Sequence, residues 1–176
     1  MSNIKLTEVY RSPDELKKVV GMFDIYVCGS DQIWSPMLLN PLFYLSYVDD
    51  KYKKNVYAPS FGMSHIPDNK KDKIKELLLR FDHISIREKQ GQKIIKELIN
   101  KEAPVLLDPT LLLSKDGWDL ISKNNNIDKP YILYYFLSEN KAYWKTVRRL
   151  AELTNYKIVI VPVTAEAYKE DGILQE

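Results

Sequence analysis

The sequence predicts an α/β protein built on a Rossmann-like parallel sheet with flanking helices. Two patterns favour this class. Short runs of β-branched and aromatic residues alternate along the chain with amphipathic segments of roughly a dozen residues, as they do in successive βαβ units. The short runs are also mostly apolar, which is typical of strands that a parallel sheet buries on both faces.

Four strands are expected in the first part of the chain, at residues 24–28, 55–58, 83–86 and 104–107. Helices are expected around them, at residues 13–23, 68–81, 87–100 and 118–121. The first helix has a clear start, because Ser12 can cap it, Pro13 suits the first helical position and Glu15 completes a capping box.

A polar, turn-forming break at residues 124–130 separates this part from the rest of the chain. Beyond it the pattern restarts, with strands expected at residues 131–137 and 157–162 and a helix at residues 141–153. The sequence therefore predicts a first Rossmann-like domain over residues 1–126, which lacks its usual first strand, and the beginning of a second over residues 127–176. Because a single βαβ unit cannot bury both faces of its strands, either this unit packs onto the first sheet or the natural protein continues beyond Glu176, and we expect the second of these.

Composition argues against several classes of protein. The chain has a formal net charge of +2, and its lysines alternate with acidic residues at helical spacing, which argues against a dedicated nucleic-acid binder. Its single cysteine, Cys28, excludes a disulfide scaffold and a metal site made of cysteines. There is no signal sequence and no apolar run of about 20 residues, so a soluble, cytoplasmic protein without a transmembrane segment is expected.

Polar or small residues follow each of the four expected strands. They are Gly29 to Gln32, Ser60 and Gly62, Arg87 and Glu88, and Asp108 and Thr110. In an open parallel sheet, ligands bind beyond the carboxyl ends of the strands, so these residues are expected to share one rim. No phosphate-binding loop, dinucleotide glycine fingerprint or histidine pair with metal-ligand spacing occurs, and we expect neither a metal ion nor a cofactor.

Each candidate residue also has a structural alternative. Asp31 could serve a ligand or only bond to backbone amides in a turn, and the same two alternatives hold for Asp108, which precedes a proline. Arg87 could pair with Glu88 or another carboxylate, although a guanidinium at a helix start opposes the helix dipole and so favours an anionic ligand. Trp34 could stack on a sugar ring or fill the edge of the core.

Four segments of this region carry motifs that belong together. They are Asp24–Trp34 (an apolar strand, then Gly-Ser-Asp-Gln-Ile-Trp), Tyr57–Gly62 (Tyr-Ala-Pro-Ser-Phe-Gly), Ile84–Gly91 (Ile-Ser-Ile-Arg-Glu, then Gly) and Leu107–Trp118 (Leu-Asp-Pro-Thr-Leu-Leu-Leu, then Trp). In this order they resemble the signature of the bacterial polysaccharide pyruvyl transferase family. Pro59 stands where alanine is commoner in that family.

The resemblance implies a fold and a reaction. The fold would be two Rossmann-like domains in a GT-B-like arrangement, with the active site in the cleft between them. The reaction would transfer the enolpyruvyl carbon skeleton of phosphoenolpyruvate, as a ketal, onto two hydroxyls of a glycan or lipid-linked sugar. Phosphate would be released, and the product would serve cell-surface polysaccharide synthesis.

The resemblance also implies roles for residues of the rim. Asp31 is expected to be the catalytic base or an acceptor contact, and Arg87 is expected to bind phosphoenolpyruvate, a compact anion that needs a guanidinium. Further substrate-binding residues are expected to be Ser30, Gln32, Trp34, Ser60 and Asp108. The resemblance further implies that another arginine and a Ser-His-Gly-like segment of the second domain complete the phosphoenolpyruvate site. No such segment occurs in this sequence, so the chain alone is expected to be inactive.

Two other functions stay open at this point. One is a GT-B-type glycosyltransferase that uses a nucleotide sugar on the same scaffold. The other is a non-catalytic binding or assembly module, in which the incomplete second domain would be covered by a partner or would form a homo-oligomer.

Overall fold

The computed structural model describes residues 7–123, 127, 129–136 and 141–161. Its backbone contacts divide the chain into two compact units, residues 1–121 and 122–176. The first unit holds the candidate site and most of the buried side chains.

The centre of the first unit is a parallel sheet of three strands. They are β1 (Ile25–Cys28), β2 (Lys53–Val56) and β3 (His83–Ile84), in the spatial order β1-β2-β3. A parallel bridge between Ile86 and Val105 continues the sheet beyond β3. These parallel strands with helices beside them confirm the predicted α/β class.

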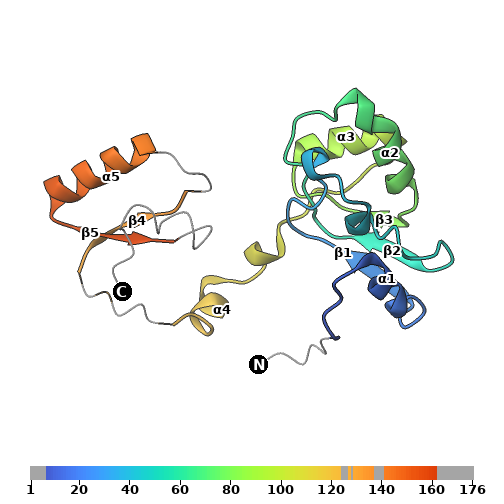
Figure 1. Ribbon diagram of the computed structural model, residues 1–176, viewed down its shortest axis with the longest axis horizontal. Helices are drawn as coiled ribbons and strands as arrows, with labels where there is room; N and C mark the ends of the chain where they lie inside the picture. The colour runs from blue at the N-terminus through green and yellow to red at the C-terminus, as the bar shows by residue number, and fades with distance from the viewer. Residues whose placement is uncertain (1–6, 124–126, 128, 137–140, 162–176) are drawn as a thin grey trace. The chain divides into compact units, whose positions relative to one another are not determined.

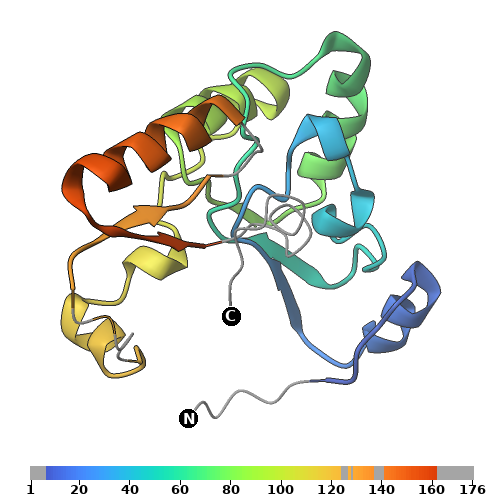
Figure 2. The same ribbon diagram turned by 60° about the vertical axis from the view of Figure 1, so that its left-hand side comes forward.

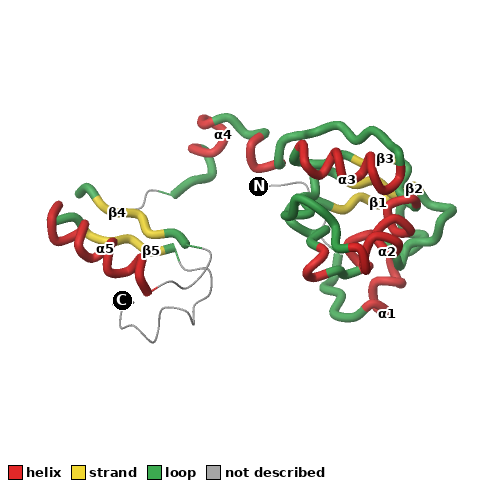
Figure 3. The backbone as a smooth tube through the Cα atoms, turned by 90° about the horizontal axis from the view of Figure 1, so that it is seen from above, coloured by secondary structure: helices red, strands yellow, loops and turns green. Residues whose placement is uncertain are grey.

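The helices of the first unit lie along the chain where the sequence pattern becomes amphipathic. They are α1 (Pro13–Leu16), α2 (Asp68–Leu79), α3 (Lys89–Ile99) and α4 (Lys115–Asp119), with the 3-10 turns η1 (Lys17–Val19), η2 (Pro36–Leu38), η3 (Pro41–Tyr44) and η4 (Pro109–Leu111). Helices α2 and α3 lie next to each other on one side of the sheet (Figure 1, Figure 3). Within the described part of the chain, no helix is both long enough and apolar enough to cross a bilayer.

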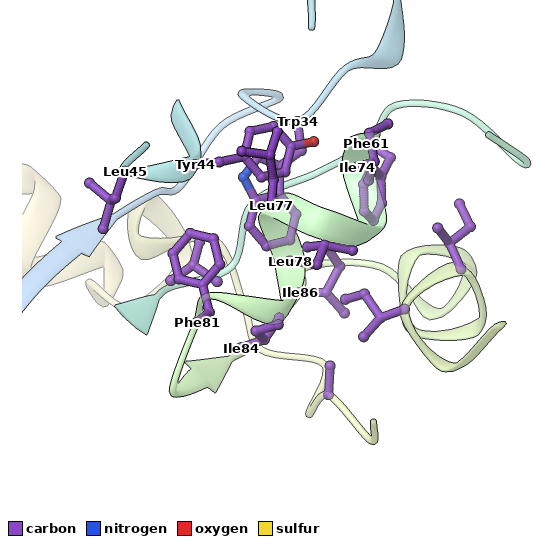
Figure 4. Close-up of a cluster of buried hydrophobic side chains, with 14 of the residues drawn as sticks. Trp34, Tyr44, Leu45, Phe61, Ile74, Leu77, Leu78, Phe81, Ile84 and Ile86 are labelled. Atoms are coloured by element: carbon purple, nitrogen blue, oxygen red, sulfur yellow. The ribbon is translucent and has the colours of Figure 1, made fainter. Parts of the chain in front are cut away.

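The core of this unit is organised around the indole ring of Trp34, which is fully buried. The ring stacks on Tyr44 with 5.1 Å between ring centroids, and Phe61 and Phe81 lie at 5.4 and 5.7 Å. Aliphatic side chains of α2 complete the cluster, with Leu77 close to the aromatic rings (Figure 4). The indole N–H is not left unpaired, because it donates to the carbonyl oxygen of Phe43 at 3.2 Å.

Only one face of the sheet is buried in the described residues, which corrects the expectation that both faces of the strands are covered. On β1, Tyr26 faces the core, whereas the neighbouring Val27 is 61% exposed. The open face carries a cavity of about 480 Å³, lined among others by Val27, Asn55 and Leu106. The apolar character of β1 on both sides explains why the sequence pattern indicated burial on both.

Several predicted elements end earlier than expected, and one is reduced to a single bridge. The first helix ends at Val19 instead of residue 23, because the Tyr26 hydroxyl donates to the Val19 carbonyl at 2.7 Å and accepts from the Gly21 N–H at 2.8 Å, which turns the chain toward β1. The second strand ends at Val56 instead of residue 58, since Ala58 takes a left-handed φ of 44°. The fourth expected strand is reduced to the single bridge at residue 105.

The second unit is one βαβ unit. Strand β4 (Tyr131–Tyr134) pairs in parallel with β5 (Lys157–Ile160), and α5 (Lys141–Thr154) connects them and runs along one face of the pair (Figure 2). Tyr134 and Trp144 stack with 4.6 Å between ring centroids and form its small core. Both strands end earlier than predicted, since residues 135, 136 and 161 do not belong to them, and only residues 137 and 162 of the expected strands lie outside the described residues.

The packing around Trp34 predicts a large effect of its truncation. We expect Trp34→Ala to lower the free energy of unfolding by about 3–5 kcal/mol, because the surrounding rings can fill the cavity only in part. Trp118→Ala is the matched control, since this side chain is exposed and its indole N–H bonds to one carbonyl, so a loss below about 1.5 kcal/mol is expected. Urea unfolding followed by far-ultraviolet circular dichroism measures both, and equal losses would contradict the central position of Trp34.

Candidate active site

The loop that follows β1 is held against the loop that follows β2. Gly29 has a φ of 116°, and a Cβ atom there would lie 2.0 Å from the carbonyl oxygen of Tyr57, so only glycine fits this approach. Further along, Ser60 N–H donates to the Asp31 carbonyl at 2.9 Å, and Trp34 N–H donates to the Ser60 carbonyl at 3.2 Å. The backbone of Trp34, whose indole is buried in the core, thus ties the end of the loop that presents Asp31 to the loop after β2.

The carboxylate of Asp108 joins three strand ends. Its Oδ2 accepts hydrogen bonds from the Ser30 hydroxyl at 2.9 Å and from Arg87 Nη1 at 3.1 Å. Its Oδ1 accepts from the N–H and the hydroxyl of Thr110, at 3.0 and 2.7 Å. Residues that follow β1, β3 and the bridge at Val105 therefore meet at one edge of the sheet, as parallel strands require.

The guanidinium of Arg87 lies among three carboxylates. Besides the bond to Asp108, its Nη2 is 3.9 Å from Asp31 Oδ1 and its Nε is 3.9 Å from Glu88 Oε2, both beyond hydrogen-bond distance. The side chain is 29% exposed, so the guanidinium is paired but remains open to solvent. Three negative groups and one positive group leave this cluster with two unbalanced negative charges.

Asp31 presents its carboxylate to solvent. The side chain is 87% exposed, while Oδ1 accepts a hydrogen bond from the Gln32 N–H at 2.7 Å. The turn that the sequence offered as the structural alternative for Asp31 is therefore present. Its hydrogen bond uses Oδ1 and does not involve Oδ2. An exposed carboxylate beside a guanidinium can accept a proton from a hydroxyl group.

The other predicted substrate-binding residues differ in exposure. Trp34 is fully buried in the core, which corrects the expectation that its ring stacks on a sugar. Ser60 is also buried, and its hydroxyl accepts from the Gly62 N–H at 2.9 Å, so it shapes the loop. Gln32 is exposed at the rim. Its amide packs against Gly62, where a Cβ atom would lie only 1.8 Å from Gln32 Nε2.

Glu88 lies at the rim, as expected, although it was not predicted to bind substrate. Its Oε1 accepts a hydrogen bond from the Phe61 N–H at 3.2 Å, and its Oε2 faces Arg87. Glu88 thereby connects the start of α3 to the loop after β2. In the sequence, the only indication of this role is that Glu88 directly follows Arg87 at the start of a helix, where carboxylates are favoured.

The hydrogen bonds to Asp108 favour its ionised form. The N–H of Thr110 makes the largest contribution, followed by the hydroxyls of Thr110 and Ser30, and together with Arg87 they lower the pKa of Asp108 to about 2. The carboxylate is therefore charged throughout the range in which proteins are ordinarily studied.

A comparison with known protein families shows to which family this chain belongs. A sequence model of the polysaccharide pyruvyl transferase family matches residues 2–171, which is nearly the whole chain. The chain belongs to this family. No curated protein and no solved structure matches it. In this family member, Asp31 and Arg87 come from separate motif segments and lie side by side at the rim.

The described residues of this pyruvyl transferase family member include no group of three or more His, Cys, Asp or Glu side chains that could hold a metal ion. The carboxylates around Arg87 are arranged about its guanidinium instead.

The lowered pKa of Asp108 predicts a pH-dependent contribution to stability. Because the ionised carboxylate is favoured in the folded state, its contribution is complete above the ordinary value of 3.8 and is lost as the pH falls through about 2. We therefore expect the difference in unfolding free energy between the wild type and Asp108→Asn to be constant near neutral pH and to shrink below about pH 4.

Urea unfolding of both proteins at a series of pH values measures this difference. Asp116→Asn, which changes an exposed carboxylate of α4, is the control and should show no such trend. A difference between wild type and Asp108→Asn that stays constant down to pH 2 would contradict the assigned hydrogen bonds.

Proposed function

We propose that this protein acts in pyruvyl transfer, with phosphoenolpyruvate as donor and two hydroxyls of a cell-surface glycan or its lipid-linked precursor as acceptor. Family membership supports the reaction class. The observation that carries the assignment to this rim is the pair formed by Arg87 and Asp31, a guanidinium and an exposed carboxylate 3.9 Å apart.

Arg87 is proposed to bind the anionic donor. Among the described residues, Nη1 is the only nitrogen of its guanidinium that donates a hydrogen bond, which leaves the edge formed by Nε and Nη2 for a carboxylate or phosphate. Such planar, two-point contacts are the strongest that a guanidinium makes. The two unbalanced negative charges of the rim oppose an anion, so we infer that further cationic groups outside this rim complete the donor site.

Asp31 is proposed to act on the acceptor. Carboxylates accept hydrogen bonds from sugar hydroxyls, and the negative charge of this rim does not oppose a neutral acceptor. The carboxylate would remove the proton of the first hydroxyl as its oxygen bonds to C2 of phosphoenolpyruvate, while a general acid delivers one proton to C3, which becomes a methyl group. Attack of the second hydroxyl at C2 then breaks the bond from C2 to the phosphate oxygen and closes the ketal, and the proton of that hydroxyl leaves with the phosphate.

Donor binding can be measured on this chain directly. We expect phosphoenolpyruvate to shift the NMR signals of the Arg87 side chain and of the loop after β1, and we expect Arg87→Ala to weaken binding roughly tenfold or more because a charge-assisted contact is lost. Arg11→Ala is the matched control, since Arg11 is exposed and lies outside the rim. Parallel titration with uridine diphosphate sugars tests a nucleotide-sugar donor, and binding of these without phosphoenolpyruvate would reject the proposal.

The role of Asp31 predicts opposite effects on binding and turnover. Asp31→Asn removes a negative charge 3.9 Å from Nη2 of Arg87, so phosphoenolpyruvate should bind at least as tightly as to the wild type. In a form of the protein with a completed donor site, assayed for phosphate release with a glycan acceptor, the same change should lower kcat by about 10²- to 10⁴-fold, because the general base is lost. Weaker donor binding with unchanged kcat would contradict this role, and Asp116→Asn is the control that should change neither.

A further inference from the structure

We infer that Asp108 is a positioning residue of this site, which fixes Arg87 and Ser30 and does not itself contact substrate. This inference rests on the proposed function for the identity of the ligand, but its geometry and its test do not depend on that ligand. It differs from the expectation that Asp108 binds substrate, and the hydrogen bonds of its carboxylate carry it.

The carboxylate of Asp108 has no acceptor position left for a ligand. A carboxylate offers about four lone-pair positions for hydrogen bonds. Four donors of the chain occupy them: the Ser30 hydroxyl, Arg87 Nη1, and the N–H and hydroxyl of Thr110. The side chain is only 20% exposed, so a sugar hydroxyl would have to displace one of these donors to reach it.

The bond from Arg87 to Asp108 also decides which edge of the guanidinium faces the rim. Asp108 holds Nη1, and a planar guanidinium that is fixed at one corner keeps its remaining edge, Nε with Nη2, in a defined direction. Asp31 and Glu88 lie 3.9 Å from the two nitrogens of that edge, so they flank the open position without occupying it by hydrogen bonds.

Thr110 in turn fixes the carboxylate plane of Asp108. Its N–H and its hydroxyl both bind Oδ1, at 3.0 and 2.7 Å, so Oδ2 is directed toward Ser30 and Arg87. Ser30 brings the loop after β1 to the same oxygen at 2.9 Å. One carboxylate therefore sets the distance between the residues that follow β1 and the guanidinium that follows β3.

The inference can be tested without substrate, by the reactivity of Arg87 toward an arginine-selective dicarbonyl reagent such as phenylglyoxal. The full 176-residue chain is labelled, and peptide mass spectrometry gives the labelling rate of Arg87 relative to that of Arg80 in the same molecules, because Arg80 is also mostly buried, at 22% exposed, and is paired with Asp50 outside the rim. In Asp108→Asn, we expect this ratio to rise roughly tenfold, because Nη1 loses its charge-assisted hydrogen bond. Asp116→Asn should leave the ratio at the wild-type value.

A purely structural role of Asp108 would not change this ratio. General loosening of the fold would raise the reactivity of both arginines together, and an unchanged ratio in folded Asp108→Asn would overturn the inference. If Asp108→Asn fails to fold, Thr110→Val decides, since it removes one hydrogen bond to Oδ1 and leaves Asp108 in place. We expect a smaller rise in the ratio for Thr110→Val, and no rise would overturn the inference.

The test of Asp108 and the test of donor binding can fail independently of each other. If phosphoenolpyruvate does not bind to the wild type while the ratio rises in Asp108→Asn, then the donor assignment fails and the positioning role of Asp108 stands. If phosphoenolpyruvate binds while the ratio does not rise, then the positioning role fails and the donor assignment stands.

Discussion

The parallel alignment of β1, β2 and β3 is the constraint on which the rest of the site depends. Because all strands of the first unit run in one direction, each of them delivers its following loop to the same edge of the sheet. The loops are then joined by backbone hydrogen bonds, such as those through Ser60, and by the side chain of Asp108. Reversal of β2 would carry Ser60 to the opposite edge of the sheet, and reversal of β1 or β3 would separate Asp31 from Arg87 by the length of a strand.

The charge balance at this edge is unusual for an anion site. The carboxylates of Asp31, Glu88 and Asp108 surround the guanidinium of Arg87 and orient it. Because carboxylates outnumber cations here, the edge favours ligands that donate hydrogen bonds. In the proposed reaction, the guanidinium edge would serve the anionic donor and the exposed carboxylate would serve the neutral acceptor. The rim thus combines a cation of fixed orientation with an exposed carboxylate.

The sequence predicted the class of fold and the residues that meet at the rim, because both follow from the order of short apolar runs and the polar residues after them. It left the partner of Arg87 open between Glu88 and other carboxylates, since Asp108 is distant in sequence and the choice depends on how the loops pack. The same limit applies to Trp34, whose two alternatives differ only in whether Tyr44 and Phe61 cover the ring. The second strand was expected two residues too far along the chain, because the left-handed backbone of Ala58 ends the extended segment and an apolar pattern does not indicate this.

The two apolar faces of β1 have a consequence for how this strand finds its place. A shift by one residue would exchange Tyr26 and Cys28 for Ile25 and Val27, and the core would still receive apolar side chains. What distinguishes the two arrangements is the phenol oxygen of Tyr26, which bonds to Val19 and Gly21 in only one of them. This polar atom at the margin of the core therefore favours the arrangement in which Tyr26 faces the core.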